Sequence, residues 1–391
     1  MFEGKKLNYR PSTENVVESL AMKLPRLAMA LLLIASPAAA SPPIFGVARP
    51  MPGMNAQFEQ TNNWIGGDGV SSVALTLERT LWLFSDTWVG SVRDGKRVNA
   101  RIVNNTLALQ DGHGTKAKLQ FVIRHDAGGK PTAFLVPENK QGWFWLHSGA
   151  CVGQRLYLFS MQMQKTGDRG VFGFRQSGEW LGVVTNPLAS PLQWRIEQYQ
   201  LLCTEFSAEH ERTFGAATLT DGEYLYIYGT DEDTRSGGRE RYLAVARVPT
   251  NEVTDFSAWR FYAGGQWETD YRKASHLTDR MATEYSVSYL PKLSEYLLIY
   301  TDRGMSPKIQ ARTAKSPWGK WSAPETIFQC PEMGKDKKIF CYAAKAHPEE
   351  ETGDALIISY VANSFDVGQV IADASLYWPR FVQVPLASGE K

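Results

Sequence analysis

The chain has 391 residues, with 42 Lys and Arg residues against 41 Asp and Glu residues, and 43% of its residues are hydrophobic. A net charge near zero gives no electrostatic reason to expect nucleic acid or an anionic membrane as a partner. The apolar fraction is too high for a disordered chain. Aromatic residues make up 12% of the sequence, which is typical of β-structure and of sugar-binding surfaces.

An export signal is predicted near the start of the sequence. Lys23 and Arg26 form a positively charged segment, which an apolar run follows from Leu27 to Ala35. Three alanines, Ala38–Ala40, then provide a small-residue cleavage site. The apolar run is shorter than the roughly 20 residues that a membrane span needs. We therefore expect cleavage and export, with no membrane attachment of the mature protein.

The predicted cleavage divides the chain into three parts. We expect residues 1–21 to be an over-extended start, residues 22–40 to be the signal peptide, and residues 41–391 to be a single domain in the periplasm or outside the cell. An oxidising compartment allows disulfides between cysteines. Cys330 and Cys341, which flank a short polar loop, are the favoured pair among the four cysteines Cys151, Cys203, Cys330 and Cys341.

A repeated strand pattern dominates the sequence after residue 41. Short β-branched and aromatic runs alternate with Gly, Asp, Asn and Pro, which predicts strands. The motif Leu81–Asp86 has counterparts that start at residues 156, 225, 297 and 356. Each copy follows a tight turn and a strand of small residues, and these first strands are Ser72–Thr76, Ser148–Cys151, Gly215–Leu219, Ser286–Leu290 and Tyr342–Ala346.

Five hairpins at this spacing leave room for two further strands each. We therefore predict an all-β domain, a five-bladed β-propeller of four-stranded antiparallel blades. A β-sandwich is the alternative, but it does not predict five-fold recurrence. The terminal segments Pro43–Val47 and Leu376–Val384 are expected to complete one blade and so to remove its exposed edge.

The hairpins also predict where functional side chains gather. In an antiparallel hairpin, the start of the first strand and the end of the second lie at the same end. One mouth of the central channel should therefore collect two residues per hairpin. The first-strand starts are Asp68, His147, Arg212, Glu284 and Tyr342, and the second-strand ends are Asp86, Gln162, Asp231, Asp302 and Asn363.

Several carboxylates at one mouth indicate sugar cleavage. Glycoside hydrolysis needs one carboxylic acid to protonate the leaving oxygen and one carboxylate to activate water or attack carbon. Crowding of like charges raises the pKa of some carboxyl groups, which lets one stay protonated near neutral pH. We predict three catalytic carboxylates, Asp68, Asp86 and Glu284. The predicted substrate-binding residues are His147, Arg212, Asp231, Asp302, Tyr342, Asn363, Trp88 and Trp145.

Structural roles compete with these assignments. An aspartate between glycines, as Asp68 is, often only forms a turn, and Asp86 could simply bond the backbone of its neighbours. Glu284 could pair with Arg280. Histidines such as His147 and His347 are more often structural than catalytic. The acidic run at residues 231–233 fits a solvated loop, and tryptophans more often pack blades than bind sugars.

Nine short motifs, taken in order, resemble one known family. They are Gly67–Ser72, Leu81–Thr87, Asn104–Thr106, Phe214–Ala217, Tyr226–Thr230, Glu284–Val287, Ser316–Ser322, Cys341–His347 and Ser359–Tyr360. Together they resemble the secreted domain of unknown function family 4185, part of which is glycoside hydrolase family 183. The resemblance runs from about residue 55 to about residue 385. One departure is Lys320, where proline is usual.

The resemblance implies a five-bladed propeller and endo-acting cleavage of D-arabinofuranan, as found in arabinogalactan and lipoarabinomannan. The paired aspartates of that family look like Asp68 and Asp86. Glu284 resembles the blade-four glutamate of related five-bladed arabinanases and arabinofuranosidases. By this analogy Asp68 is the base or nucleophile, Glu284 or Asp86 is the acid, and the reaction inverts the anomeric configuration.

The leading hypothesis is thus an exported hydrolase of a furanose polysaccharide, acting as a monomer or small homo-oligomer. It requires no cofactor, although carboxylate and carbonyl oxygens in the channel leave room for a structural calcium ion. A non-catalytic carbohydrate-binding propeller is the second hypothesis. The third is a polysaccharide lyase in which Tyr342, with His147 or His347, abstracts a proton.

Overall fold

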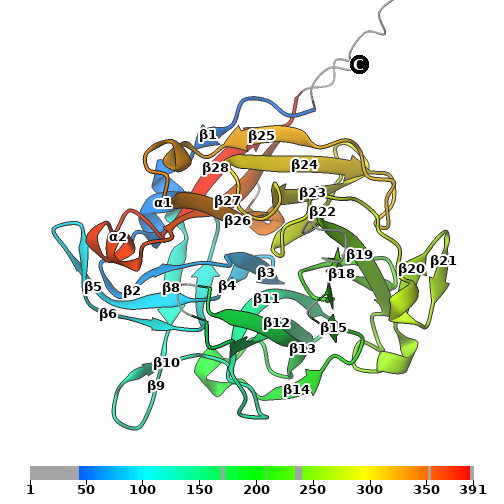
Figure 1. The fold of residues 1–391 in the computed structure, drawn as a ribbon, viewed down its shortest axis with the longest axis horizontal. Helices are drawn as coiled ribbons and strands as arrows, with labels where there is room; N and C mark the ends of the chain where they lie inside the picture. Colours follow the sequence, from blue (N-terminus) through cyan, green and yellow to red (C-terminus); the bar gives the residue numbers. More distant parts are fainter. Residues whose placement is uncertain (1–43, 169–171, 208, 234–239, 351–353, 388–391) are drawn as a thin grey trace, which may run out of the picture. The chain divides into compact units, whose positions relative to one another are not determined.

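The computed structural model describes residues 44–168, 172–207, 209–233, 240–350 and 354–387 (Figure 1). The predicted signal peptide and the segment before it lie outside these residues. One unit extends over Pro43–Lys391. In the described ranges, none of the helices has the length and apolar character that a membrane crossing requires.

Antiparallel sheets dominate the described chain, which confirms the predicted all-β class. Five sheets have four strands or more, and we number them 1 to 5 in chain order. Sheet 1 contains β3 (Ser71–Thr76), β4 (Arg79–Phe84), β7 (Thr106–Asp111) and β8 (Lys118–Val122). Sheet 2 contains β11 (Trp143–Val152), β12 (Arg155–Lys165), β13 (Phe174–Val184) and β14 (Ile196–Gln200). Sheet 4 contains β22 (Tyr285–Leu290), β23 (Glu295–Thr301), β24 (Lys308–Ala314) and β25 (Glu325–Gln329).

Sheets 3 and 5 differ from these three sheets in strand number or strand order. Sheet 3 has additional short strands and contains β15 (Glu205–Phe206), β16 (His210–Arg212), β17 (Ala217–Asp221), β18 (Tyr224–Asp233), β19 (Glu240–Pro249), β20 (Arg260–Ala263) and β21 (Gln266–Glu268). Sheet 5 has the order β1 (Arg49–Pro50), β28 (Pro379–Pro385), β27 (Ala355–Ser364) and β26 (Ile339–Ala346). The expectation that both terminal segments complete one sheet is confirmed, because Phe45 also bridges Leu386.

Smaller elements lie outside these five sheets. A three-stranded sheet contains β2 (Asn62–Gly67), β5 (Thr87–Arg93) and β6 (Lys96–Val103), and β9 (Arg124–His125) pairs with β10 (Pro131–Thr132). Helix α1 (Pro52–Phe58) begins at a proline and packs on β28. Helix α2 (Val367–Ala372) packs on β6 and β27, and the Asp366 carboxylate caps it by accepting from the amides of Gly368 and Gln369.

The five predicted hairpins are present as β3–β4, β11–β12, β17–β18, β22–β23 and β26–β27. Their first strands surround one axis in chain order (Figure 1). Side chains of sheet 1 bond to both neighbouring sheets. Ser71 Oγ donates to the carbonyl of His147 at 2.9 Å, and Ser72 Oγ lies 2.8 Å from His347 Nδ1. These contacts close the ring between sheet 5 and sheet 2.

The hydrophobic core is divided among the spaces between neighbouring sheets. Phe159 of sheet 2 packs with Phe214 and Trp259 from the region of sheet 3, and all three are buried. Between sheets 5 and 1, Trp82 contacts Phe381 edge to face at 5.7 Å. Burial of each such side chain contributes about 1.5–3 kcal/mol. Much of the aromatic content therefore packs the sheets together.

The cysteines are free thiols in this structure. Cys330 and Cys341, the favoured pair, are buried and their thiols share a hydrogen bond. That bond, together with burial, raises the pKa of the Cys330 thiol. The two residues expected to pair are thus neighbours, but as thiols rather than as a disulfide.

Arg97 on β6 connects the last part of the described chain to its first part. Its buried guanidinium donates to the carbonyl oxygens of Ile65, Val370 and Leu376 at 3.0, 2.6 and 2.7 Å. Because Ile65 lies on β2 and the other two precede β28, one side chain fixes both segments.

Replacing Arg97 with leucine should lower the free energy of unfolding by about 1–3 kcal/mol for each buried carbonyl left without a donor. The measurement is the midpoint of urea unfolding. Arg101→Leu is the matched control, because Arg101 lies on the same strand and is exposed. Equal midpoints for the two variants would contradict the proposed connection.

Candidate active site

A cavity of about 650 Å³ lies where the predicted strand ends meet. Seven of the predicted site residues line it: Asp68, Asp86, Glu284, Tyr342, Asn363, Trp88 and Trp145. His147, Arg212, Asp231 and Asp302 do not belong to its lining. The three predicted catalytic carboxylates therefore share one cavity.

Asp68 stands in a turn between β2 and β3 that glycine makes possible. Gly69 has a φ of +75°, and a Cβ there would come within 2.7 Å of the Ser85 hydroxyl. Asp68 Oδ2 accepts hydrogen bonds from the hydroxyls of Tyr342 and Tyr377 at 2.6 and 2.7 Å. Its Oδ1 is buried and has no hydrogen-bond partner among the described residues. One oxygen is thus fixed, and the other is left for a ligand.

Asp86 lies directly across from Asp68, in the connection from β4 to β5. The Asp68 amide donates to the carbonyl of Asp86 at 3.2 Å, which holds the two turns together. Asp86 Oδ1 accepts from Trp145 Nε1 at 2.8 Å and from Asn104 Nδ2 at 3.1 Å. Both partners are neutral donors, so they orient the carboxylate without neutralising it.

Glu284 approaches from sheet 4 and pairs with Lys345. The Lys345 ammonium lies 3.5 Å from Glu284 Oε1 and also donates to the carbonyl of Gly69. Lys345 is only 2% exposed. The register of β26 shifts between Tyr342 and Lys345. This irregularity lets two residues three positions apart both reach the site, although a regular strand would point them to opposite faces.

Two carboxyl groups at this site, those of Asp68 and Asp86, have raised pKa values. Burial raises the pKa of Asp68 to about 8, and the charges of Asp86 and Glu284 act in the same direction, against the two tyrosine hydrogen bonds. Burial raises the pKa of Asp86 to about 6, against the hydrogen bonds from Trp145 and Asn104. At neutral pH, Asp68 therefore holds a proton while Asp86 is mostly ionised.

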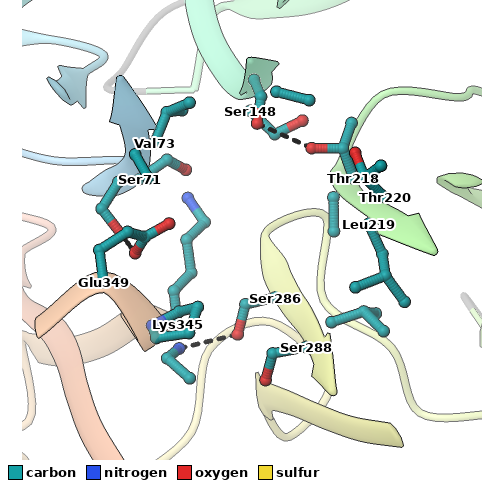
Figure 2. A pocket seen from close by; sticks show the side chains of 18 of the residues that line it. Ser71, Val73, Ser148, Thr218, Leu219, Thr220, Ser286, Ser288, Lys345 and Glu349 are labelled. Atoms are coloured by element: carbon teal, nitrogen blue, oxygen red, sulfur yellow. Dashed lines mark hydrogen bonds between the residues drawn. The ribbon is translucent and has the colours of Figure 1, made fainter. Parts of the chain in front are cut away.

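Lys345 also borders a second cavity of about 340 Å³ along the inner strands, which Figure 2 shows. Small and hydroxylated side chains line it, among them Ser72, Ser286 and Ser288. The Glu349 carboxylate accepts from Ser72 Oγ at 2.6 Å. The Lys345 ammonium thus connects this second cavity to Glu284, which lines the larger one.

Asp231 and Arg212 form a separate buried group in sheet 3. The Asp231 carboxylate accepts from Arg212 and His210, and from His276 Nε2 at 2.9 Å. Although burial raises its pKa, hydrogen bonds from His276 and Arg212 and the positive charge of Arg212 lower the pKa of Asp231 to about 2. The acidic run is therefore not a solvated loop at this position, since Asp231 is 1% exposed. Its partners occupy both oxygens.

Asp302 and His147 also form hydrogen bonds within the protein, which give both residues a structural role. The Asp302 carboxylate accepts from Arg280, at 2.8 Å for Arg280 Nε. The sequence suggests Arg280 as a structural partner of Glu284, but Arg280 pairs with Asp302 instead. His147 occupies a register shift in β11 and bridges Glu179 and the carbonyl of Thr283 at 3.2 and 2.8 Å. It thereby holds the residue next to Glu284.

Three residues at the site had not been singled out from the sequence as site residues: Tyr377, Lys345 and Asn104. Asn104 and Lys345 lie inside two of the nine sequence motifs, Asn104–Thr106 and Cys341–His347. These motifs are a signal of their importance but do not indicate a role. Tyr377 had no such signal. It stands before β28 with a φ of +73°, a conformation unusual for a residue with a side chain.

Among the described residues, no group of three or more His, Cys, Asp and Glu side chains is placed to hold a metal ion. Carboxyl, phenol, indole and guanidinium groups line the larger cavity.

One family model matches residues 53–386. The chain belongs to that family, Domain of unknown function (DUF5005). The resemblance to family 4185 and to glycoside hydrolase family 183 is not confirmed by this match. No curated protein matches the DUF5005 chain in sequence.

A solved structure shares the fold of this DUF5005 domain, and others match it at lower scores. A protein from Bacteroides ovatus ATCC 8483, provisionally assigned as a hydrolase, has 18% identity and a TM-score of 0.70, and the match covers 86% of this chain and 90% of that one. A GH43_1 enzyme from Xanthomonas citri, complexed with xylotriose, has 14% identity and a TM-score of 0.46, with 88% and 91% covered. A GH43 beta-xylosidase/alpha-arabinofuranosidase from a compost microbial metagenome, also in complex with xylotriose, has 11% identity and a TM-score of 0.45, with 88% and 94% covered.

Proposed function

We propose that this protein is a five-bladed β-propeller glycoside hydrolase that is exported and cleaves a furanose polysaccharide. The ring of five sheets supports the propeller assignment. The observation that carries the function is the pair Asp68 and Asp86. The two lie on adjacent turns in one cavity, and their pKa values are raised to different extents, to about 8 and about 6. Separated pKa values of this kind distinguish an acid from a base.

The protonation states favour Asp68 as the general acid. Its Oδ2 is occupied by two tyrosine hydroxyls, so a proton on Oδ1 is free to pass to the glycosidic oxygen. Asp86, ionised and oriented by Trp145 and Asn104, then activates water or attacks the anomeric carbon. This reverses the roles expected from the sequence, in which Asp68 is the base or nucleophile.

Glu284 then acts through its charge. Paired with Lys345, it contributes negative charge that raises the pKa of Asp68 and so keeps the acid protonated. As the positive charge of an oxocarbenium-like transition state develops, the same carboxylate stabilises it. Glu284 is thus proposed as an electrostatic partner rather than as the proton donor.

D-arabinan is the first candidate substrate. The motifs that carry Asp68 and Asp86 resemble those of endo-acting D-arabinofuranan hydrolases, and Trp88 and Trp145 line the cavity beside them. The test incubates the protein with D-arabinan, L-arabinan and other polysaccharides, followed by chromatography of the products. We expect oligosaccharides from D-arabinan that are lost in Asp68→Asn and Asp86→Asn.

Asp94→Asn is the matched control for this test, because Asp94 is exposed in the turn between β5 and β6. Products from another polymer would support the proposed hydrolase activity but would identify a different substrate. Glycan binding without any product would favour the carbohydrate-binding propeller, and an unsaturated product that absorbs ultraviolet light would favour the lyase.

The pH dependence follows from the same pKa values. Activity requires Asp86 ionised and Asp68 protonated, so kcat/KM should rise as pH passes about 6 and fall as it passes about 8. These limits belong to the interacting pair as a whole. A profile with only one limb would contradict the assignment.

Tyr377→Phe should move the alkaline limb to higher pH. The Tyr377 hydroxyl donates to Asp68 Oδ2 and stabilises its ionised form, so removing it raises the pKa of Asp68 further. The measurement is kcat/KM against pH for the variant and the wild type. Tyr199→Phe is the control, because the Tyr199 hydroxyl bonds the exposed Glu197 in sheet 2. An unchanged alkaline limb in Tyr377→Phe would show that another group sets it.

A further inference from the structure

A chain of aromatic side chains connects the two catalytic aspartates over the rim of the cavity. We call it the aromatic arc, and it consists of Trp145, Phe174, Phe172, Phe365, Phe340 and Tyr342. Successive ring centroids are 4.8, 6.1, 5.8, 4.5 and 5.3 Å apart. One end of the arc donates to Asp86 through Trp145 Nε1, and the other end donates to Asp68 through the Tyr342 hydroxyl.

The arc joins two sheets that are not neighbours. Its first half comes from sheet 2 and its second half from sheet 5, while sheet 1 lies between them. The contact between Phe172 and Phe365 therefore completes a wall beside Asp68 and Asp86.

This wall is apolar where it meets solvent. The side chains of Phe172 and Phe365 are 47% and 46% exposed. Three further apolar residues, Ile102, Val367 and Met305, line the same cavity and are 45%, 43% and 47% exposed. Apolar side chains gathered at one rim in this way mark a binding surface.

A second wall of the cavity, from sheets 3 and 4, is charged. Arg303, which forms an ion pair with Glu240 at 2.6 Å, lines the cavity together with Arg241. Sugar hydroxyls find hydrogen-bond partners on this side. The middle of the aromatic arc offers them none, because phenylalanine has no polar atom. Aliphatic neighbours such as Val367 also lack the flat face on which a sugar ring stacks.

From this asymmetry we propose that the cavity binds an apolar group, aryl or alkyl, that the glycan carries next to the bond being cleaved. The inference rests on the proposed function, because it takes Asp68 and Asp86 as the place of cleavage. The sugar lies against the charged wall, and its apolar substituent or aglycone lies against the aromatic arc. Transfer of the apolar group from water to this wall supplies binding energy in proportion to its area.

The test measures equilibrium binding, so it does not depend on hydrolysis. The probes are thioglycosides, which resist cleavage: methyl, butyl and phenyl 1-thio-arabinofuranosides, and the same three thioglucopyranosides. Each CH2 that is fully buried lowers Kd by about fourfold. Because the wall is partly exposed, the three CH2 groups by which butyl exceeds methyl should together lower Kd by about tenfold. Comparison of the Kd values of the phenyl and butyl probes shows whether the cavity binds an aryl or an alkyl group more tightly.

Phe172→Ser combined with Phe365→Ser should remove most of this gain. Both side chains are about half exposed, so their replacement leaves the core intact, which near-ultraviolet circular dichroism checks. Leu77→Ser is the control, since Leu77 is 91% exposed outside the cavity lining. Equal Kd values for methyl, butyl and phenyl probes would overturn the proposal, as would a gain that survives in the double variant. A gain for both sugars without cleavage of any polysaccharide would instead refute only the proposed hydrolysis.

Discussion

Replacing Asp68 with asparagine should lower kcat on a polysaccharide by about 10²–10⁴-fold, the usual contribution of a general acid. The loss should be much smaller on a nitrophenyl glycoside of the same sugar, because a nitrophenolate leaves without receiving a proton. Comparing the two substrates therefore tests the role as well as the residue. A similar loss on both would mean that Asp68 is the base or nucleophile, as the sequence resemblance implies.

The same variant has a second expected effect, on stability. The pKa of Asp68 is raised in the folded state, so between its ordinary value of 3.8 and about 8 the folded protein holds a proton that the unfolded chain has released. The free energy of unfolding of the wild type should therefore fall as pH rises through this interval. Asparagine cannot ionise, so Asp68→Asn should lose part of that decline. Urea unfolding at pH 5 and pH 8 measures it, with Asp94→Asn as the control that keeps the decline.

Replacing Asp86 with alanine should lower kcat on the order of 10³-fold or more on both kinds of substrate. Water activation, or attack on the anomeric carbon, is needed whatever the leaving group is. The alanine leaves a space beside Trp145 and Asn104 that a small anion such as azide can enter. We expect azide to restore turnover and to yield a glycosyl azide.

The configuration of that azide is informative. Nuclear magnetic resonance of its anomeric proton, compared with that of the wild-type product, separates retention from inversion. Asp68→Ala is the comparison variant, and it should give no azide adduct on a polysaccharide. Absence of azide rescue in Asp86→Ala, with the fold intact, would remove Asp86 from the role of base or nucleophile.

The repeat in the sequence predicted the arrangement of the inner strands. The motif around Leu81 recurs because each second strand is buried on both faces, and burial restricts those positions to apolar residues. The β2–β5–β6 sheet and the additional strands of sheet 3 have no repeated pattern. Each of these strands occurs only once, so no repeat in the sequence predicts it.

The site was predictable where it depends on strand ends and not where it depends on side-chain direction. Asp68 and Asp86 were found because hairpin geometry brings their backbones together. His147 was expected at the same mouth, but a register shift in β11 turns it to Glu179. Lys345 reaches the site because of the irregularity in β26. Side chains along a regular strand alternate between its two faces, and local departures from this alternation cannot be recognised in a single sequence.

The position of Tyr377 has a consequence for how the protein is made. Asp68 and Asp86 are translated well before the tyrosine that bonds Asp68 and before the segment that Arg97 holds in place. A nascent chain can therefore contain both aspartates long before their surroundings exist. The surroundings of Asp68 are complete only when translation has passed β28 and the ring of sheets has closed.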